Sequence, residues 1–349
     1  MLELLAAVAF GLVIYQLLSR DPLAQYDTPD GEYFSSDNDS SSLQSIRSDI
    51  ESDLGEARQL PLREQIGYLR QSLDSFFDKV EKAADFHPID DPEVRGEWVL
   101  APGVDCSRRL LYIHGGAFYV GSPKSHRVIT SRLSEIANCA VLAVDYRLMP
   151  EHKRSQGIED CRTAYDWLLT HDPQGENRQT TAVFIAGDSA GGNLTLSLLS
   201  WIRDTQRPVP NGAVALSPVT DMCMRNPSIK SNSEHDVILR PLYKLLNRLP
   251  RLLVMILSYF TTRYRPAHPD ISPIYGDLAN MPPILVHASN HEMLRDDGRR
   301  YVNKARQAGT DARLQLWQHM PHVWHIFYPN LTEADQAFEQ IRLFINQHS

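Results

Sequence analysis

The sequence has few cysteines, and none of them lies close to another. Only Cys106, Cys139, Cys161 and Cys223 occur in 349 residues, with no C-x-x-C pair. Four thiols so widely spaced are too few to staple a domain of this size, and they lack the spacing of a zinc site. We therefore predict free thiols that are buried as small apolar side chains, with no disulfide and no metal.

The sequence shows no basic stripe that would suit a nucleic acid. The formal net charge is -8 at pH 7, and residues 20–60 alone hold ten carboxylates against three arginines. The remainder of the chain is close to neutral on average, and the acidic stretch would repel phosphate backbones and anionic membrane surfaces. A nucleic-acid partner is therefore not expected.

One apolar run is long enough to concern a membrane, and it lies at the N-terminus. Residues 2–18 are apolar apart from Glu3 and Gln16, which is about the length that crosses a thin bilayer. A cleavable signal peptide fits less well, because no Lys or Arg precedes the run and its only A-x-A pattern, Ala7 to Ala9, falls too early. We favour a membrane anchor over a helix packed on the body, and the orientation of this anchor in the membrane stays open. The rest of the protein is expected to be cytoplasmic.

Two segments of contrasting composition follow the apolar run. Residues 20–60 are rich in Ser and Asp and poor in apolar side chains, so we expect an acidic linker that cannot offset the entropy of ordering. Beyond Pro61, apolar residues from Leu62 to Val80 recur at helical spacing and predict an amphipathic helix. We assign 1–19 to the apolar segment and 61–349 to one domain, with a cap at 62–85 and 222–262.

From about residue 108, short apolar strands alternate with helical stretches. Strands are predicted at 108–113, 140–146, 181–186, 212–217, 283–289 and 312–317. Helices are predicted at about 125–138, 157–171, 191–204, 295–308 and 331–347. This alternation predicts an α/β fold with a mostly parallel central sheet and helices on both faces. The interval 222–275 breaks the rhythm, and its apolar run from Val237 to Phe260 indicates an inserted helical segment.

A serine stands on a sharp turn between a predicted strand and a predicted helix. The motif GDSAG at 187–191 follows the strand TAVFIA and leads into GGNLTLSLLSWIRD. Gly187 and Gly191 permit the strained backbone and close packing that such a turn needs, which would hold Ser189 toward a substrate. The motif alone is common, but this context favours a nucleophile over an ordinary surface serine.

A second glycine-rich turn, HGGAF at 114–118, follows the strand RRLLYI. Two glycines and an alanine leave backbone N–H groups unshielded, and such groups can stabilise a developing oxyanion. The candidate donors are the N–H groups of Gly115, Gly116, Ala117 and Ala190. We interpret His114 as a residue that orders this loop.

A serine nucleophile needs a base and a third group that orients the base. With this type of turn the chain order is serine, acid, histidine, and the candidates in HMPHVWH and NHEMLRDD are His319, His322, His325, Glu292, Asp296 and Asp297. Both segments follow strands, at the carboxyl edge where open α/β sheets bind ligands. We prefer Glu292, which lies nearest its strand, because Asp296 and Asp297 suit a helix start. A metal bound by the three histidines is disfavoured, because their spacing does not converge outside a helix.

These motifs resemble the hormone-sensitive lipase family of α/β hydrolases, the group that includes bacterial acetyl esterases and arylacetamide deacetylase. The resemblance spans about residues 108–345 and rests on HGGAF, DYRLMPEH at 145–152, GDSAGGN at 187–193, the stretch from SPIYG to RDDG, and MPHVWH. It implies an α/β-hydrolase fold with a helical cap and hydrolysis of short- to medium-chain acyl esters through an acyl-enzyme, without a cofactor. It also implies Ser189 as nucleophile, His322 as base and Glu292 as acid.

Two positions depart from the family pattern. Ala117 stands where a third glycine is usual, and Glu292 stands where Asp is commoner. The expected partner is a small-molecule acyl ester, whose identity is open, as is the oligomeric state. Two alternatives also stay open: an amidase or deacetylase with the same triad, and a catalytically silent binding protein on this fold.

Overall fold

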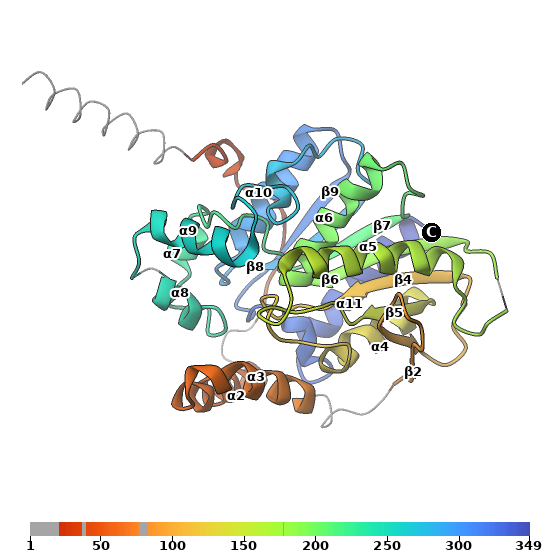
Figure 1. The fold of residues 1–349 in the computed structure, drawn as a ribbon, viewed down its shortest axis with the longest axis horizontal. Helices are drawn as coiled ribbons and strands as arrows, with labels where there is room; N and C mark the ends of the chain where they lie inside the picture. Colours follow the sequence, from red (N-terminus) through yellow and green to blue (C-terminus); the bar gives the residue numbers. More distant parts are fainter. Residues whose placement is uncertain (1–20, 37–39, 77–82, 177, 247) are drawn as a thin grey trace, which may run out of the picture.

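The computed structural model describes residues 21–36, 40–76, 83–176, 178–246 and 248–349. They form a nine-stranded sheet in the order β1-β9-β8-β7-β6-β4-β5-β3-β2 (Figure 1). Six strands match the predicted ones: β4 (Arg108–Ile113), β5 (Ala140–Val144), β6 (Ala182–Asp188), β7 (Gly212–Leu216), β8 (Ile284–Ser289) and β9 (Ala312–Trp317). All six pair in parallel, which confirms the predicted fold class.

Both faces of this sheet are covered by helices. They are α4 (Arg127–Ala137), α5 (Arg154–Thr170), α6 (Ala190–Asp204), α10 (Arg295–Gln307) and α11 (Thr332–Gln347). Because successive side chains of a strand point to opposite faces, Leu111 and Ile113 of β4 pack with α5, α6 and α10, while Leu110 and Tyr112 pack with α4 and α11. The prediction of helices on both faces is therefore confirmed.

Three outer strands, the two edge strands β1 and β2 and the strand β3 next to β2, were missed by the sequence patterns. β3 (Gly96–Leu100) pairs antiparallel with β5 and with β2 (Asp85–Pro88), and β1 (Glu32–Phe34) pairs in parallel with β9. β1 and β2 have only three and four residues and are mostly exposed, so they lack the apolar run that marks a central strand. Their pairing depends on the neighbouring strand rather than on their own composition.

The prediction of a linker over residues 20–60 was wrong for the part that the structure describes. Helix α2 (Ser41–Gln59) buries Leu43 and Ile46 in a cluster that includes Trp317 and Trp324. The side chain of Ser40 accepts the N–H of Leu43 and caps the helix. The other members of this cluster come from residues 317–337, so α2 packs against the body although its own sequence has few apolar side chains.

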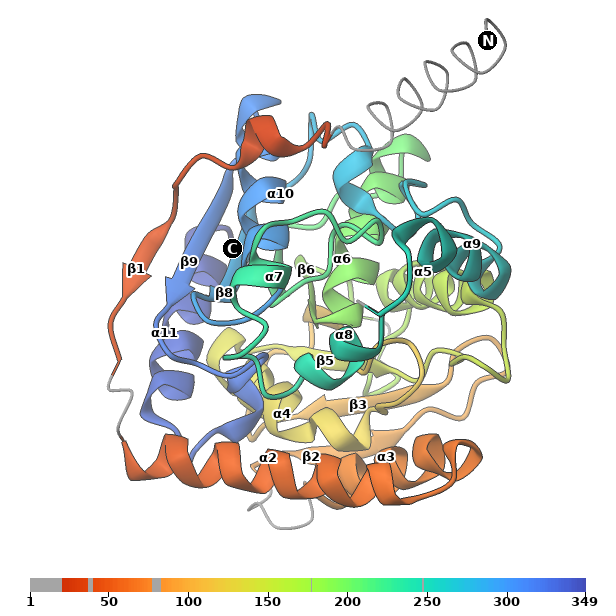
Figure 2. The ribbon, with the colours of Figure 1, turned by 90° about the vertical axis from the view of Figure 1, so that its left-hand side faces the viewer.

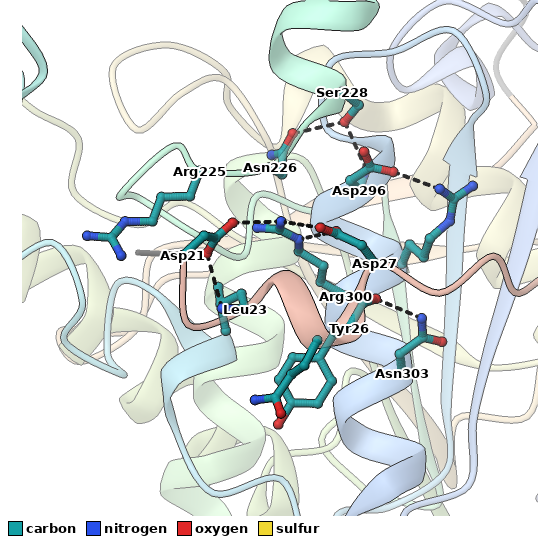
Figure 3. Close-up of polar contacts among 12 residues, drawn as sticks. Asp21, Leu23, Tyr26, Asp27, Arg225, Asn226, Ser228, Asp296, Arg300 and Asn303 are labelled. Atoms are coloured by element: carbon teal, nitrogen blue, oxygen red, sulfur yellow. Dashed lines mark hydrogen bonds and ion pairs between the residues drawn. The ribbon is translucent and has the colours of Figure 1, made fainter. Parts of the chain in front are cut away.

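Three of the acidic residues that precede α2, Asp21, Asp27 and Asp30, are ion-paired with α10, and Figure 3 shows the first two. Arg300, only 1% exposed, donates to Asp21 at 2.7 Å and to Asp27 at 2.5 Å on either side of the short helix η1 (Ala24–Tyr26). Arg306 pairs with Asp30. These three carboxylates thus have cationic partners on a distant helix. The charge of the segment by itself suggests disorder because it does not include those partners.

The predicted cap regions are helical. They contain α3 (Leu62–Phe76), α7 (Ser228–Ser231), α8 (Arg240–Leu246) and α9 (Arg251–Thr262), and Figure 2 looks onto the last three. Arg70 of α3 donates to the carbonyl of Tyr119 at 2.8 Å, which ties α3 to the loop after β4. The short helices η3 (Lys124–His126), η4 (Pro273–Tyr275) and η5 (Trp324–Phe327) lie in loops.

The apolar run at residues 2–18 lies outside the described residues, so the anchor prediction stays a prediction. Within the described ranges, no helix combines the length and apolar character needed to cross a membrane. The four cysteines are buried and free.

Candidate active site

Ser189 occupies the predicted turn between β6 and α6. Its backbone has φ 51° and ψ −113°, a combination that residues other than glycine rarely adopt. Its N–H donates to the carbonyl of Leu216 at 2.7 Å. A side chain at Gly191 would overlap the carbonyl oxygens of Ile113 and His114, so the start of α6 lies directly against the end of β4. This close approach explains why the motif needs a glycine after the serine.

The structure brings Ser189, His322 and Glu292 into one hydrogen-bonded chain. His322 Nε2 lies 2.9 Å from Ser189 Oγ, and His322 Nδ1 lies 2.6 Å from Glu292 Oε2. Because an ionised carboxylate only accepts, Nδ1 carries the proton and Nε2 can accept the proton of the serine hydroxyl. His322 and Glu292 are 4% and 1% exposed, so this chain is shielded from water on the side away from Ser189.

Glu292 is held from two directions. Its Oε1 accepts the N–H of Ser289 at 2.7 Å, and the next residue, Met293, donates its N–H to Asp236 at 2.8 Å. Burial would lower the pKa of His322, but the hydrogen bond and charge of Glu292, with the charges of Asp236 and Asp188, raise it above its ordinary value. The imidazolium form of His322, which would result from taking the hydroxyl proton of Ser189, is therefore stabilised.

The other two acid candidates are engaged elsewhere. Asp296 pairs with Arg295 at 2.8 Å and Arg299 at 3.0 Å. Asp297 accepts the N–H groups of Thr220 and Asp221 at 2.6 and 2.8 Å. Both lie in the first turn of α10, as expected of carboxylates at a helix start, although neither side chain makes a capping hydrogen bond there. Neither carboxylate is hydrogen-bonded to His322, whose partner is Glu292.

The histidines of HMPHVWH have separate surroundings. His325 is buried 3.0 Å from His287, and burial lowers the pKa of both well below the ordinary value, to about 3 for His287. The ring of His319 lies 4.4 Å from that of His291. In the part of the chain that the structure describes, no group of three or more His, Cys, Asp or Glu residues is arranged to hold a metal ion.

The loop after β4 needs one correction to the predicted oxyanion donors. The N–H of Gly115 donates to Asp188 Oδ1 at 2.9 Å and is therefore not free for an oxyanion. A side chain at Gly115 would overlap the Asp188 carboxylate, which explains the glycine. The N–H groups of Gly116, Ala117 and Ala190 have no hydrogen-bond acceptor among the described residues, so they keep their candidate role.

Asp188, the residue before the serine, was not singled out from the sequence. Its Oδ1 also accepts the hydroxyl of Tyr112 at 2.6 Å, and its Oδ2 lies 3.4 Å from His126 Nε2. Burial would raise the pKa of Asp188, but the charge and hydrogen bond of His126, together with Tyr112, lower it. His114 stacks on Tyr146 and contacts the carbonyl of Gly115, as expected of a loop-ordering residue.

Arg154 is a second residue that the sequence patterns missed. Its guanidinium carbon lies 3.7 Å from the ring centre of Phe118, in the loop after β4. The guanidinium also donates a hydrogen bond to Asn193 Oδ1 at 2.9 Å. Burial lowers the pKa of Arg154 to about 10. The side chain therefore links the loop after β4 to the helix that follows Ser189, a link between segments far apart in sequence.

Comparison with known proteins agrees with this geometry. A family model described as alpha/beta hydrolase fold matches residues 110–326. The chain is 36% identical to an acetyl-hydrolase of Streptomyces hygroscopicus, over 71% of this chain and 78% of the relative. It is 32% identical to an esterase of Acinetobacter venetianus, over 74% of this chain and 80% of the relative.

A solved structure extends the match to most of the chain. The crystal structure of an esterase from the bacterial hormone-sensitive lipase family superposes with a TM-score of 0.75 and 32% identity, covering 88% of this chain and 98% of that one. This protein therefore belongs to the α/β-hydrolase fold family, in its hormone-sensitive lipase group of esterases.

Proposed function

We propose that the protein hydrolyses short- to medium-chain carboxylic esters through an acyl-enzyme on Ser189. The observation that carries the proposal is the hydrogen-bonded chain from Ser189 through His322 to Glu292, placed beside free backbone N–H groups. A nucleophile, a base, an orienting acid and oxyanion donors are the four parts that acyl transfer requires.

In the first half of the reaction, Ser189 Oγ attacks the ester carbonyl while His322 Nε2 takes the hydroxyl proton. Glu292 holds the ring and stabilises the imidazolium. The N–H groups of Gly116, Ala117 and Ala190 face the oxyanion. In comparable sites, each such donor lowers the activation free energy by about 3 to 4 kcal/mol. His322 then gives its proton to the leaving alcohol.

In the second half, water replaces the alcohol. His322 takes a proton from water, the hydroxide adds to the acyl carbonyl, and collapse of the second tetrahedral species breaks the bond to Ser189 Oγ. The His322 imidazolium gives its proton to that oxygen, which releases the acid and restores Ser189 and His322. No group other than these side chains and the backbone donors is needed, so the proposal includes no cofactor.

The departure at Ala117 bears on the acyl or alcohol group that fits. Ala117 has φ 53° and is exposed, so its methyl group lies at the surface of the oxyanion loop rather than in the core. A methyl group beside the oxyanion restricts bulky groups more than a hydrogen does, which supports a small acyl or alcohol group. The name of the Streptomyces relative, an acetyl-hydrolase, supports the same choice.

The test is hydrolysis of p-nitrophenyl esters of graded acyl length by the wild type and by Ser189→Ala. We expect the variant to keep its melting temperature and to fall below about a thousandth of wild-type turnover. Ser155→Ala, at an exposed serine of α5, is the matched control and should stay active. Persistent turnover by purified Ser189→Ala would reject the nucleophile, and faster cleavage of matched anilides than of esters would favour an amidase.

A further inference from the structure

Helix α9 turns an apolar stripe toward solvent. Leu253, Ile256, Leu257 and Phe260 follow the i, i+3, i+4, i+7 spacing of one helix side. Their side chains are 39%, 43%, 45% and 59% exposed. In a helix that covers a globular body, such a stripe normally faces the core. The outward direction therefore calls for a partner.

Helices α8 and α9 together carry most of the exposed large apolar side chains. Of the nine large apolar or aromatic side chains that are exposed among the described residues, six lie on α8 and α9. We call these six the α8–α9 face: Leu242, Leu253, Ile256, Leu257, Tyr259 and Phe260. Exposed apolar side chains scattered singly need no explanation, but a gathered patch marks an interaction surface. Figure 2 looks onto the two helices that carry it.

The segment that carries this face is positively charged. Residues 237–269 hold six Lys or Arg and no Asp or Glu, a local concentration that the near-neutral average of the body conceals. Lys244, Arg248, Arg263 and Arg265 are exposed, and none forms an ion pair with a carboxylate in the described ranges. The guanidinium of Arg263 lies 5.8 Å from the ring centre of Phe260, so the charge borders the apolar stripe directly.

We propose that the α8–α9 face docks on an anionic lipid bilayer. Apolar and aromatic side chains flanked by cations are the features of a helix that lies in a membrane interface, where the cations contact lipid phosphates and the apolar stripe enters the acyl boundary. This surface is separate from the proposed reaction, because none of its residues takes part in the chemistry of Ser189. It is also distinct from the predicted anchor at residues 2–18, which carries no Lys or Arg and whose only charged residue is Glu3.

Two other occupants fit the charges less well. In a twofold dimer the same patch meets itself, so the cations of one copy would face the cations of the other. Residues 2–18 of the same chain offer one carboxylate against at least four exposed cations. An anionic lipid surface satisfies the apolar stripe and the charge together.

The location of α8 connects this face to the active site. Tyr243 of α8 is buried against Met293, the neighbour of Glu292. A body docked through α8 and α9 would therefore hold its cap, and the loop beneath it, toward the lipid.

The experiment is sedimentation of the full chain with vesicles of phosphatidylcholine alone and of phosphatidylcholine and phosphatidylglycerol in equal parts. The measured quantity is the ratio of binding to anionic over neutral vesicles, which separates this face from a neutral contribution of residues 2–18. Two variants are compared: Arg263→Gln with Arg265→Gln, and Ile256→Ser with Phe260→Ser. The matched controls are Arg58→Gln with Arg63→Gln, and Val209→Ser with Leu343→Ser, all at exposed positions outside α7, α8 and α9.

We expect the wild type to prefer anionic vesicles and to lose that preference at high salt. The charge variant should reduce the ratio by about tenfold or more, since each cation near an anionic surface contributes about a factor of five. The apolar variant should reduce binding to anionic vesicles, both controls should bind like wild type, and hydrolysis of a soluble ester should be unchanged in all of them.

Three results would overturn the assignment. The first is an equal ratio in wild type and charge variant, and the second is vesicle binding that both variants retain in full. The third is a wild-type dimer in sedimentation velocity that becomes a monomer in the apolar variant, because a second copy would then cover the face. A wild type without esterase activity would reject the proposed function and leave vesicle binding as an independent result.

Discussion

The carboxylate of Asp188 accepts the backbone N–H of Gly115 at 2.9 Å, which ties the residue before the nucleophile to the loop that follows β4. The two segments are distant in sequence and come from adjacent parallel strands, β6 and β4. Through this bond, the turn that presents Ser189 also positions the loop that carries the N–H groups of Gly116 and Ala117, which have no acceptor among the described residues. One buried carboxylate thus positions both the proposed nucleophile and the loop that holds two of the candidate oxyanion donors.

Replacing Asp188 by Asn should disturb the oxyanion loop more than the serine and histidine. We expect turnover to fall by about 10- to 100-fold, less than for loss of the nucleophile, because the free N–H groups are displaced rather than removed. The control is Tyr112→Phe, which removes the second donor to Asp188 but keeps the bond to Gly115. Equal losses in both variants, or wild-type turnover in folded Asp188→Asn, would contradict this role.

Glu292→Gln tests the acid of the triad. The amide cannot stabilise the imidazolium or hold the required tautomer, so turnover should fall by about 10³ to 10⁴ while KM changes less. Asp296→Asn is the matched control: it weakens the pairs with Arg295 and Arg299 and should lower the Tm while turnover stays near wild type. Turnover and melting curves of both variants decide, and the reverse pattern would assign the acid to Asp296.

The pH dependence of kcat/KM should report the raised pKa of His322. The reaction needs the neutral imidazole, so activity should decline as pH falls through this pKa, and the midpoint should lie above the ordinary value of 6.5. Asp236→Asn removes one of the charges that favour the imidazolium and should move the acid limb to lower pH. Glu234→Gln, at an exposed neighbour, should leave the limb in place, and an unmoved limb in Asp236→Asn would refute the contribution of that charge.

Removing Arg300 should loosen the segment at 21–30. Arg300→Met leaves Asp21 and Asp27 without their buried partner, and because both carboxylates stay partly exposed, we expect a loss of roughly 1 to 3 kcal/mol in unfolding free energy. Arg306→Gln breaks a pair that is about 40% exposed on each side and should cost less than about 1 kcal/mol. Urea unfolding of the two variants measures the difference, and equal losses would show that burial of Arg300 adds nothing.

The central sheet and the order of the reacting residues could be predicted because both depend on local signals. Six apolar runs of strand length alternate with helical stretches, and this alternation determines a parallel sheet whose loops gather at one edge. Ser189, Glu292 and His322 each follow a strand of that sheet, so the topology alone brings them to the same edge. In the structure, His322 is hydrogen-bonded to both Ser189 and Glu292.

The edges of the molecule and the supports of the site were decided by tertiary structure. Residues 21–36 and 40–59 looked like a linker because their own apolar content is low, yet they pair with β9, bury Leu43 and meet Arg300. In the same way, the glycines of HGGAF predict an oxyanion donor at Gly115, but the folded chain brings Asp188 to its N–H. Strand and helix patterns depend on neighbours in sequence, whereas an ion pair or a shared hydrogen bond depends on which distant side chain arrives, and only the folded chain determines that.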